Sequence, residues 1–273
     1  MNNTDHFQPL IRLLREVTPA QYIFLLGTTE VTRTAKSIFN KETPVCEEIE
    51  QYYLLVLIPH NSQETNNQTQ EHIESKCQPF YPVTAMVLDT IQFIDWLKEG
   101  HPFASQVLHH AEILFKEEEV VLGDYPAISV EDVVNSNQIV HLQGLNKVVE
   151  FLAGADLFRI RQQNRMAAFM LHQAVEHALL TILKMTMGVK VNTHNLDKLI
   201  RYSSMIGFEA ATIFPRKTES DRRLFQLLQR AYVESRYGQD YNINYLDLVV
   251  LFSRVDRLKE LLKNISHQGI THR

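Results

Sequence analysis

The second half of the chain has hydrophobic residues at the three- and four-residue spacing of α-helices. This spacing predicts helices over 130–160, 162–187, 195–206, 219–237 and 243–265. Ser129 is a candidate N-cap for the first helix, and Thr193 or Asn195 for the third. Gly188 and Gly207 stand where helix C-caps belong, because glycine adopts left-handed backbone angles without steric cost. The pattern therefore predicts an all-α helical bundle over 129–273.

The predicted helix 162–187 is apolar around nearly its whole circumference, which is typical of the central helix of a bundle. Gln173 and Glu176 nevertheless fall within one of its hydrophobic stripes. Burying a polar group without a partner costs roughly 2–7 kcal/mol, so both side chains need partners. They form either a satisfied polar pair in the core or part of a site.

A later predicted helix offers a partner for Glu176. Tyr232 and Arg236 are four residues apart and share a helix face. Arg236 is the natural counter-charge, so we predict a buried or half-buried Glu176–Arg236 ion pair. The alternative is that Gln173, Glu176, Arg236 and Tyr237 form the wall of a nucleotide or anion pocket.

The first half of the chain mixes strand and helix patterns. Apolar runs at 22–27, 52–58 and 83–88 predict buried strands. Amphipathic spacing predicts helices at 5–17, 90–99 and 102–117, while 28–40 and 60–78 are each predicted as a helix or a loop. The stretch 123–129 holds Gly, Pro and Ser together and marks a linker. We therefore predict an α+β domain over 1–123, with a small mixed sheet and helices.

Composition narrows the class of protein. The chain has 273 residues, of which 45% are hydrophobic, enough for two globular domains. A net charge of -5 argues against general nucleic-acid binding. The two cysteines, Cys46 and Cys77, have no metal-ligand spacing, and the first ten residues lack a signal-peptide pattern. The apolar run 52–58 is too short to span a membrane. We expect a cytoplasmic protein without membrane contact.

Three segments in order carry a family resemblance: HQAVEHALLTIL at 172–183, THNLDKLI at 193–200 and AYVESRY at 231–237. Together they resemble the HEPN (higher eukaryotes and prokaryotes nucleotide-binding) family, from about residue 130 to the end. The resemblance implies a nucleotide ligand and a homodimer formed through the helical domain. It also makes His194 the family's most regular polar position. His194 either bonds to the backbone that opens its helix or packs on the preceding turn; the alternative is ligand contact.

Some proteins that this half resembles are metal-independent ribonucleases with an Arg-x4-6-His motif on a late helix. In that chemistry, His acts as general acid or base and Arg stabilises the phosphorane charge. Here no His follows Arg236 within that window. Arg165 and His172 fit this motif, with six residues between them, but they lie on the early central helix. We expect His172 to be a polar or partly buried residue beside the stripe, with the nuclease pair as the alternative.

The first half resembles nucleotidyltransferases in its strand, Gly-containing turn and second apolar strand. In that family a Gly-Ser turn brings backbone N–H groups to the nucleotide phosphates, and acids at the second strand hold Mg²⁺. Here Gly27 and Thr28 take the turn positions, whereas Gln51 and Tyr53 replace the two acids. Neither is a competent Mg²⁺ ligand, so Mg²⁺ is not expected, although Asp89 could mimic a third acid. The resemblance implies a degenerate nucleotidyltransferase-like domain.

Three functions follow from these resemblances. The first, which we favour, is a non-catalytic nucleotide- or partner-binding protein with a regulatory or scaffolding role. Its candidate nucleotide-binding residues are Gly27, Thr28, Gln173, Glu176, His194, Arg236 and Tyr237. The second is an active nucleotidyltransferase of the antitoxin or aminoglycoside-modifying type. The third is a toxin-like HEPN ribonuclease. We predict no catalytic and no metal-binding residue.

Overall fold

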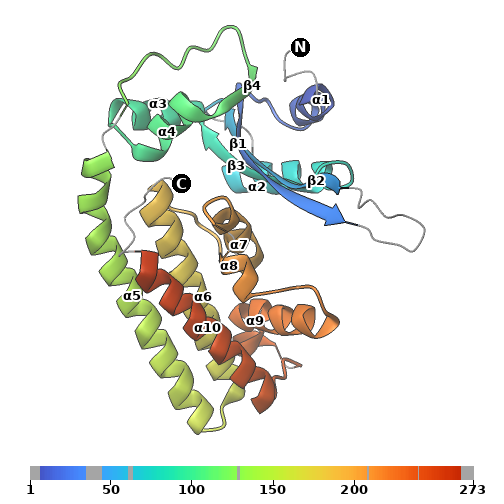
Figure 1. Cartoon of the computed structure of the whole chain (residues 1–273), viewed down its shortest axis with the longest axis vertical. Coiled ribbons are helices and arrows are strands. Elements are labelled where there is room, and N and C mark those ends of the chain that lie inside the picture. The colour runs from blue at the N-terminus through green and yellow to red at the C-terminus, as the bar shows by residue number, and fades with distance from the viewer. Residues whose placement is uncertain are drawn as a thin grey trace. The chain divides into compact units, whose positions relative to one another are not determined.

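A computed structural model describes residues 7–34, 45–60, 64–127, 130–207, 209–238 and 240–265, with side chains except at 31–34, 45–50 and 130–137. The chain divides into two compact units, 1–128 and 129–273 (Figure 1). The first unit contains a sheet and helices, and the second is helical. This confirms the predicted fold class, α+β followed by all-α.

The described strands of the first unit form one mixed sheet in the order β3-β2-β1-β4. The strands are β1 Tyr22–Thr34, β2 Val45–Ile58, β3 Val83–Asp89 and β4 Glu112–Lys116. Strand β1 is antiparallel to both β2 and β4, whereas β2 is parallel to β3. The parallel pair is joined through a helix, as a parallel connection requires.

Helices cover both faces of this sheet (Figure 1). They are α1 Gln8–Val17, α2 Asn66–Cys77, α3 Thr90–Lys98 and α4 Pro102–His110. On one face Ile23 belongs to a buried core with Leu14 of α1 and Ile73 of α2. The next residue, Phe24, points the other way and meets Phe93 of α3, because successive strand side chains alternate between faces.

Two predictions for the first half were wrong. Residues 28–34 are not a helix or loop: β1 continues through them and pairs with β2, while 35–40 lie outside the described residues. The predicted helix 102–117 ends at His110, and Glu112–Lys116 is the edge strand β4. In both places a neighbouring strand supplies the backbone hydrogen bonds, and this pairing outweighs the local helical preference.

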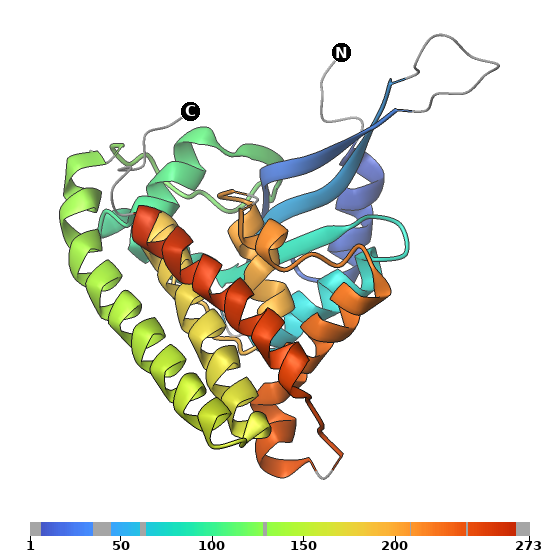
Figure 2. The same cartoon turned by 60° about the horizontal axis from the view of Figure 1, so that its bottom comes forward.

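Six helices of the described residues build the second unit. They are α5 Val130–Ile160, α6 Asn164–Met187, α7 Leu196–Ser204, α8 Glu209–Ile213, α9 Glu219–Tyr237 and α10 Tyr245–Ile265. Helix α6 packs against α5, α7, α9 and α10, and Figure 2 shows α5 and α10 running alongside it. By length and composition α6 could cross a membrane, but 67% of its apolar window is buried. Its apolar circumference is that of the bundle's central helix, as predicted.

The ends of α6 and α7 are set by their capping residues. Gly188 ends α6 in the left-handed conformation, with φ of 71°, as predicted. Asn195 caps α7 by accepting a hydrogen bond from the Lys198 N–H, while the Thr193 hydroxyl accepts one from the Asn195 N–H. Gly207 is not a cap, because α7 ends with Met205 in the right-handed region. Helix α8 was not predicted, and Ser129 lies outside the described residues.

Candidate functional site

Glu176, near the middle of α6, is the centre of a buried polar cluster. Its Oε1 lies 3.0 Å from Nδ1 of His194, and its Oε2 accepts a hydrogen bond from the Gln173 amide at 3.3 Å. Nε2 of His172 lies 3.4 Å from the same Oε2, and the other ring nitrogen of His172 is 3.0 Å from the carbonyl of Leu228. Glu176, the acid in the hydrophobic stripe, therefore has partners on α6 itself and at His194, just before α7.

The charge state of Glu176 follows from this cluster. Burial by itself raises the pKa of the Glu176 carboxyl, but the hydrogen bonds and charges of His172 and His194 outweigh it and lower the pKa below 4.5. Glu176 is a carboxylate at neutral pH. Its negative charge faces His172 and His194 inside the bundle.

The predicted ion pair between Glu176 and Arg236 is wrong. The Nε of Arg236 donates to the carbonyl of Tyr232 at 2.9 Å, and the guanidinium lies 4.6 Å from the Tyr232 ring centre. It also lies 5.1 Å from the rings of Phe169 and Tyr237. Arg236 and Tyr232 share a face as predicted, but aromatic rings and a carbonyl hold the guanidinium instead of a carboxylate.

Tyr232 links Glu176 and Arg236 indirectly. The ring of His194 stacks on that of Tyr232 with centroids 4.3 Å apart. Glu176 meets this stacked pair through His194, whereas Arg236 meets it through Tyr232. His194 therefore bonds to the core carboxylate rather than to the opening backbone of its helix.

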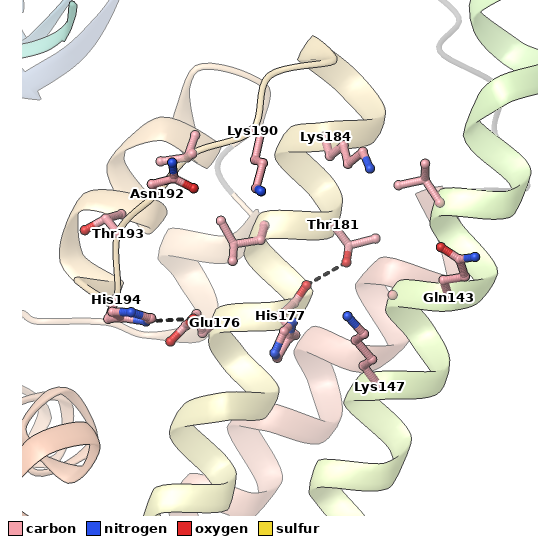
Figure 3. A pocket seen from close by; sticks show the side chains of 14 residues that line it. Gln143, Lys147, Glu176, His177, Thr181, Lys184, Lys190, Asn192, Thr193 and His194 are labelled. Carbon is pink, nitrogen blue, oxygen red and sulfur yellow. Dashed lines mark hydrogen bonds and ion pairs between the residues drawn. The ribbon is translucent and has the colours of Figure 1, made fainter. Parts of the chain in front are cut away.

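A cavity of about 410 Å³ opens beside Glu176, between α5, α6 and the segment 188–195 (Figure 3). Helix α5 contributes Lys147, α6 contributes Lys184 and the segment contributes Lys190. The remaining lining residues are Val140, Gln143, Gly144, Glu176, His177, Leu180, Thr181, Val191, Asn192, Thr193 and His194. None of the three lysines forms an ion pair with a described residue, so the cavity has an excess of positive charge.

His177 is an uncharged histidine in the lining of this cavity. Burial lowers its pKa below 6.5, the nearby Lys147 ammonium lowers it further, and Glu176 opposes both. Its ring is held against Phe151, with centroids 5.2 Å apart and planes at 11°. At neutral pH an uncharged imidazole therefore stands beside the Lys147 ammonium.

Gly144 allows α5 and α6 to approach closely at the wall of the pocket. A Cβ at this position would lie 2.1 Å from the Thr181 hydroxyl and 2.4 Å from its methyl group. No side chain larger than hydrogen fits without movement of the helices. The Thr181 hydroxyl is held in place by donating to the His177 carbonyl at 2.6 Å.

The structure divides the candidate residues of the helical unit into three groups. Glu176 and His194 line the cavity, Gln173 supports Glu176, and Arg236 and Tyr237 belong to the aromatic cluster outside the lining. The three lysines and His177 were not singled out from the sequence. His177 and Lys184 are seven residues apart on one face of α6 and could have been noticed. Lys147 and Lys190 join them only through the packing.

Arg165 and His172, the alternative nuclease pair, serve different partners. The Arg165 guanidinium donates to the carbonyl of Glu234 at 3.1 Å and to that of Gly238, at the end of α9. His172 is fully buried and faces Leu228 and Glu176. Each of the two side chains therefore bonds to backbone carbonyls of α9 or of the residue after it.

In the first unit the candidate phosphate turn is not a turn. Gly27 and Thr28 lie within β1, opposite Tyr53 and Tyr52 of β2, with a bulge just before Gly27. The prediction of a turn at Gly27 and Thr28 was therefore wrong.

The two residues that replace the metal-binding acids, Gln51 and Tyr53, also form internal hydrogen bonds. The Tyr53 hydroxyl is buried 3.1 Å from the Thr29 hydroxyl, and the Gln51 amide donates to the Pro82 carbonyl at 2.7 Å. Asp89 caps α3 by accepting from the N–H groups of Ile91 and Gln92. Over the described residues, no group of three or more His, Cys, Asp or Glu is arranged to hold a metal ion.

Comparison with known protein families gives a match in the helical unit. The model of the HEPN domain matches residues 145–265, so the helical unit carries a HEPN domain. No curated protein matches the chain. Among solved structures, a nucleotidyltransferase-like protein from Exiguobacterium sibiricum 255-15 is 12% identical, with 96% of this chain and 76% of that chain covered and a TM-score of 0.25.

Proposed function

We propose that the HEPN domain binds a nucleotide in the cavity between α5, α6 and the segment 188–195, and does so without catalysis. The observation that supports this most directly is the set of three lysines around one cavity. Their charges have no carboxylate partner among the described residues. The one acid in the lining, Glu176, is already engaged by His172 and His194. A phosphate group would supply the missing negative charge.

The rest of the lining suits the other parts of a nucleotide. Lysine ammonium groups bind phosphate as point charges from a range of directions. Val140, Leu180 and Val191 offer apolar surface to a base, and Asn192 and Thr193 offer polar groups to a sugar. A volume of about 410 Å³ lies within the usual range for small-molecule sites, roughly 300–1,000 Å³.

Two features support a binding role over catalysis. In the helical unit, His172 has no solvent access and Arg165 is held by two backbone carbonyls. In the first unit, Gln51 and Tyr53 stand where nucleotidyltransferases have acids, and each is used in an internal hydrogen bond. We propose that the chain acts as a nucleotide-responsive regulatory or scaffolding protein.

Calorimetric titration of the full chain with AMP, ADP and ATP tests the proposal, in EDTA and again with Mg²⁺. We expect binding that Lys147→Gln, Lys184→Gln and Lys190→Gln each weaken about tenfold, or ~1.4 kcal/mol. Lys217→Gln removes the same charge from an exposed position outside the cavity and should leave the affinity unchanged.

Equal affinity of all four variants, or no binding by the parent chain, would contradict the proposed site. Nucleotide turnover or RNA cleavage that disappears in Lys147→Gln would contradict the non-catalytic role. Circular dichroism of each variant checks that the helical unit is intact before binding is compared.

A further inference from the structure

The three lysines of the cavity beside Glu176 come from different parts of the helical unit. Lys147 lies on α5, Lys184 on α6 and Lys190 in the segment 188–195. Figure 3 shows Lys184 and Lys190 in the upper part of the cavity and Lys147 in the lower part, beside His177. The positive charge is therefore spread along the cavity.

The two ends of the cavity are separated along α6. His177, whose pKa the Lys147 ammonium lowers, and Lys184 are seven residues apart in this helix. At the helical rise of 1.5 Å per residue, this separation is about 10 Å. A single phosphate group covers only part of that distance, whereas a chain of phosphates reaches lysines at both ends.

The balance of charges in the lining favours the longer ligand too. Glu176 is the only acid among the lining residues, and His172 and His194 already face its carboxylate. Burial lowers the pKa of His177, so its imidazole adds no charge at neutral pH. Three ammonium charges are therefore left for a ligand. A phosphate monoester carries a charge of about −1.5 to −2 at pH 7, which is too little to match them.

The lining offers no carboxylate to a magnesium ion. In nucleotide sites Mg²⁺ is usually held by one or two protein carboxylates together with the phosphate oxygens. Glu176, the one carboxylate of the lining, is buried and engaged by two histidines. A Mg²⁺ ion carried by the nucleotide would also meet the like charge of the lysines.

We infer that the cavity binds the diphosphate or triphosphate chain of a nucleotide without Mg²⁺, between Lys147 at one end and Lys184 and Lys190 at the other. This inference rests on the proposed function and names the class of ligand. The lysines take the place of the metal as counter-charges of the phosphate oxygens. Mg²⁺ weakens the binding because it removes metal-free nucleotide from solution, so the occupancy of the cavity depends on the free Mg²⁺ concentration.

Calorimetric titration of the full chain tests both the phosphate chain and the metal. In EDTA, ADP should bind about tenfold more tightly than AMP. Mg²⁺ in large excess should weaken the apparent affinity for ADP about tenfold and that for AMP less, because only the metal-free fraction binds. Sodium chloride at the same ionic strength is the control, because salt also screens the lysines.

A lysine variant tests the placement of the chain. Lys147→Gln should weaken ADP about tenfold and AMP less, because a phosphate held between Lys184 and Lys190 does not use Lys147. Lys217→Gln, which removes an exposed charge outside the cavity, should leave the ratio of the two affinities unchanged. Inorganic pyrophosphate should displace ADP, and orthophosphate at the same concentration should not. Pyrophosphate that binds as tightly as ADP would overturn the nucleotide as the ligand.

The outcomes separate this inference from the proposed function. Equal affinities for AMP and ADP in EDTA, or tighter ADP binding with Mg²⁺, would overturn the inference. Binding of either nucleotide that still depends on the three lysines would nevertheless support the proposed function. The absence of any nucleotide binding would overturn both.

Discussion

The sheet unit and the helical unit both contain polar residues with internal hydrogen bonds, but only the helical unit has a lysine-lined cavity beside them among the described residues. In the sheet, the uncharged Thr29 and Tyr53 bond to each other and Gln51 bonds to a carbonyl. In the bundle, Glu176 is equally satisfied, but the adjoining cavity holds lysines without described acidic partners. Glu176, like Gln51 and Tyr53, is therefore held by partners inside its own unit. The candidate site is the neighbouring place where charge is left unpaired.

The unfolding of the two units can be followed by separate spectroscopic signals. The only tryptophan of the chain, Trp96, lies in α3 of the sheet unit, so its fluorescence follows that unit. The far-ultraviolet circular dichroism signal comes mainly from the long helices of the second unit. Each variant below can be followed with both signals.

The largest effect is expected for Glu176→Ala. It leaves the fully buried His172 without its carboxylate neighbour, and breaking a buried ionic cluster costs about 3 kcal/mol. The dichroism transition in urea should move to lower denaturant, while the Trp96 transition stays in place. Glu260→Ala, which removes a half-exposed acid on α10, should change the stability little, because solvent screens its ion pairs. A Glu176→Ala variant as stable as Glu260→Ala would show that the cluster is not structural.

A pair of glycines in α5 should give opposite changes. Gly144→Ala places a methyl group within 2.1 Å of Thr181, so we expect a loss of about 1–3 kcal/mol as α5 is pushed from α6. At Gly154 the nearest atom to a new Cβ is the Met170 sulfur at 3.5 Å, an ordinary contact. Gly154→Ala should therefore stabilise the helix by up to about 1 kcal/mol through its better helix propensity. Thermal unfolding followed by dichroism measures both, and equal shifts would contradict the close approach.

A smaller effect is expected in the sheet unit. Tyr53→Phe removes one hydroxyl and leaves that of Thr29 buried without this partner, which should cost about 1 kcal/mol. The Trp96 transition should shift and the dichroism transition of the helices should not. Nucleotide affinity should be unchanged. A Tyr53→Phe variant with weakened nucleotide binding would return the candidate site to the sheet.

The smallest effect concerns the protonation of His177. Its pKa is lowered mainly by burial and further by Lys147, so the neutral form stabilises the fold above pH 6.5 and this contribution is lost as the pH falls through the lower, folded pKa. Lys147→Gln should raise the pKa of His177 and weaken this loss in acid. Proton NMR titration of the imidazole measures the shift, with Lys217→Gln as the charge-matched control. A fall in the pKa, or an equal rise in the control, would contradict the contact.

The sequence predicted the helical unit well because its signals are local. Helix period, the glycine that ends α6 and the asparagine that caps α7 act within a few residues of each other. The sheet was less predictable because a strand depends on a partner that is distant in sequence. Residues 28–34 and 112–116 became strands only because β2 and β1 lie beside them.

The candidate site was likewise only partly predictable from the sequence. The pattern around Glu176 established that a buried acid needs partners, and helical spacing placed Gln173 on the same face of α6. Only the tertiary structure decided that histidines rather than Arg236 meet the carboxylate, and that Lys147, Lys184 and Lys190 surround one cavity. Periodicity fixes which face of a helix is buried. Which charges meet across that face depends on the crossing of α5, α6 and the segment 188–195, and therefore on packing between distant parts of the chain.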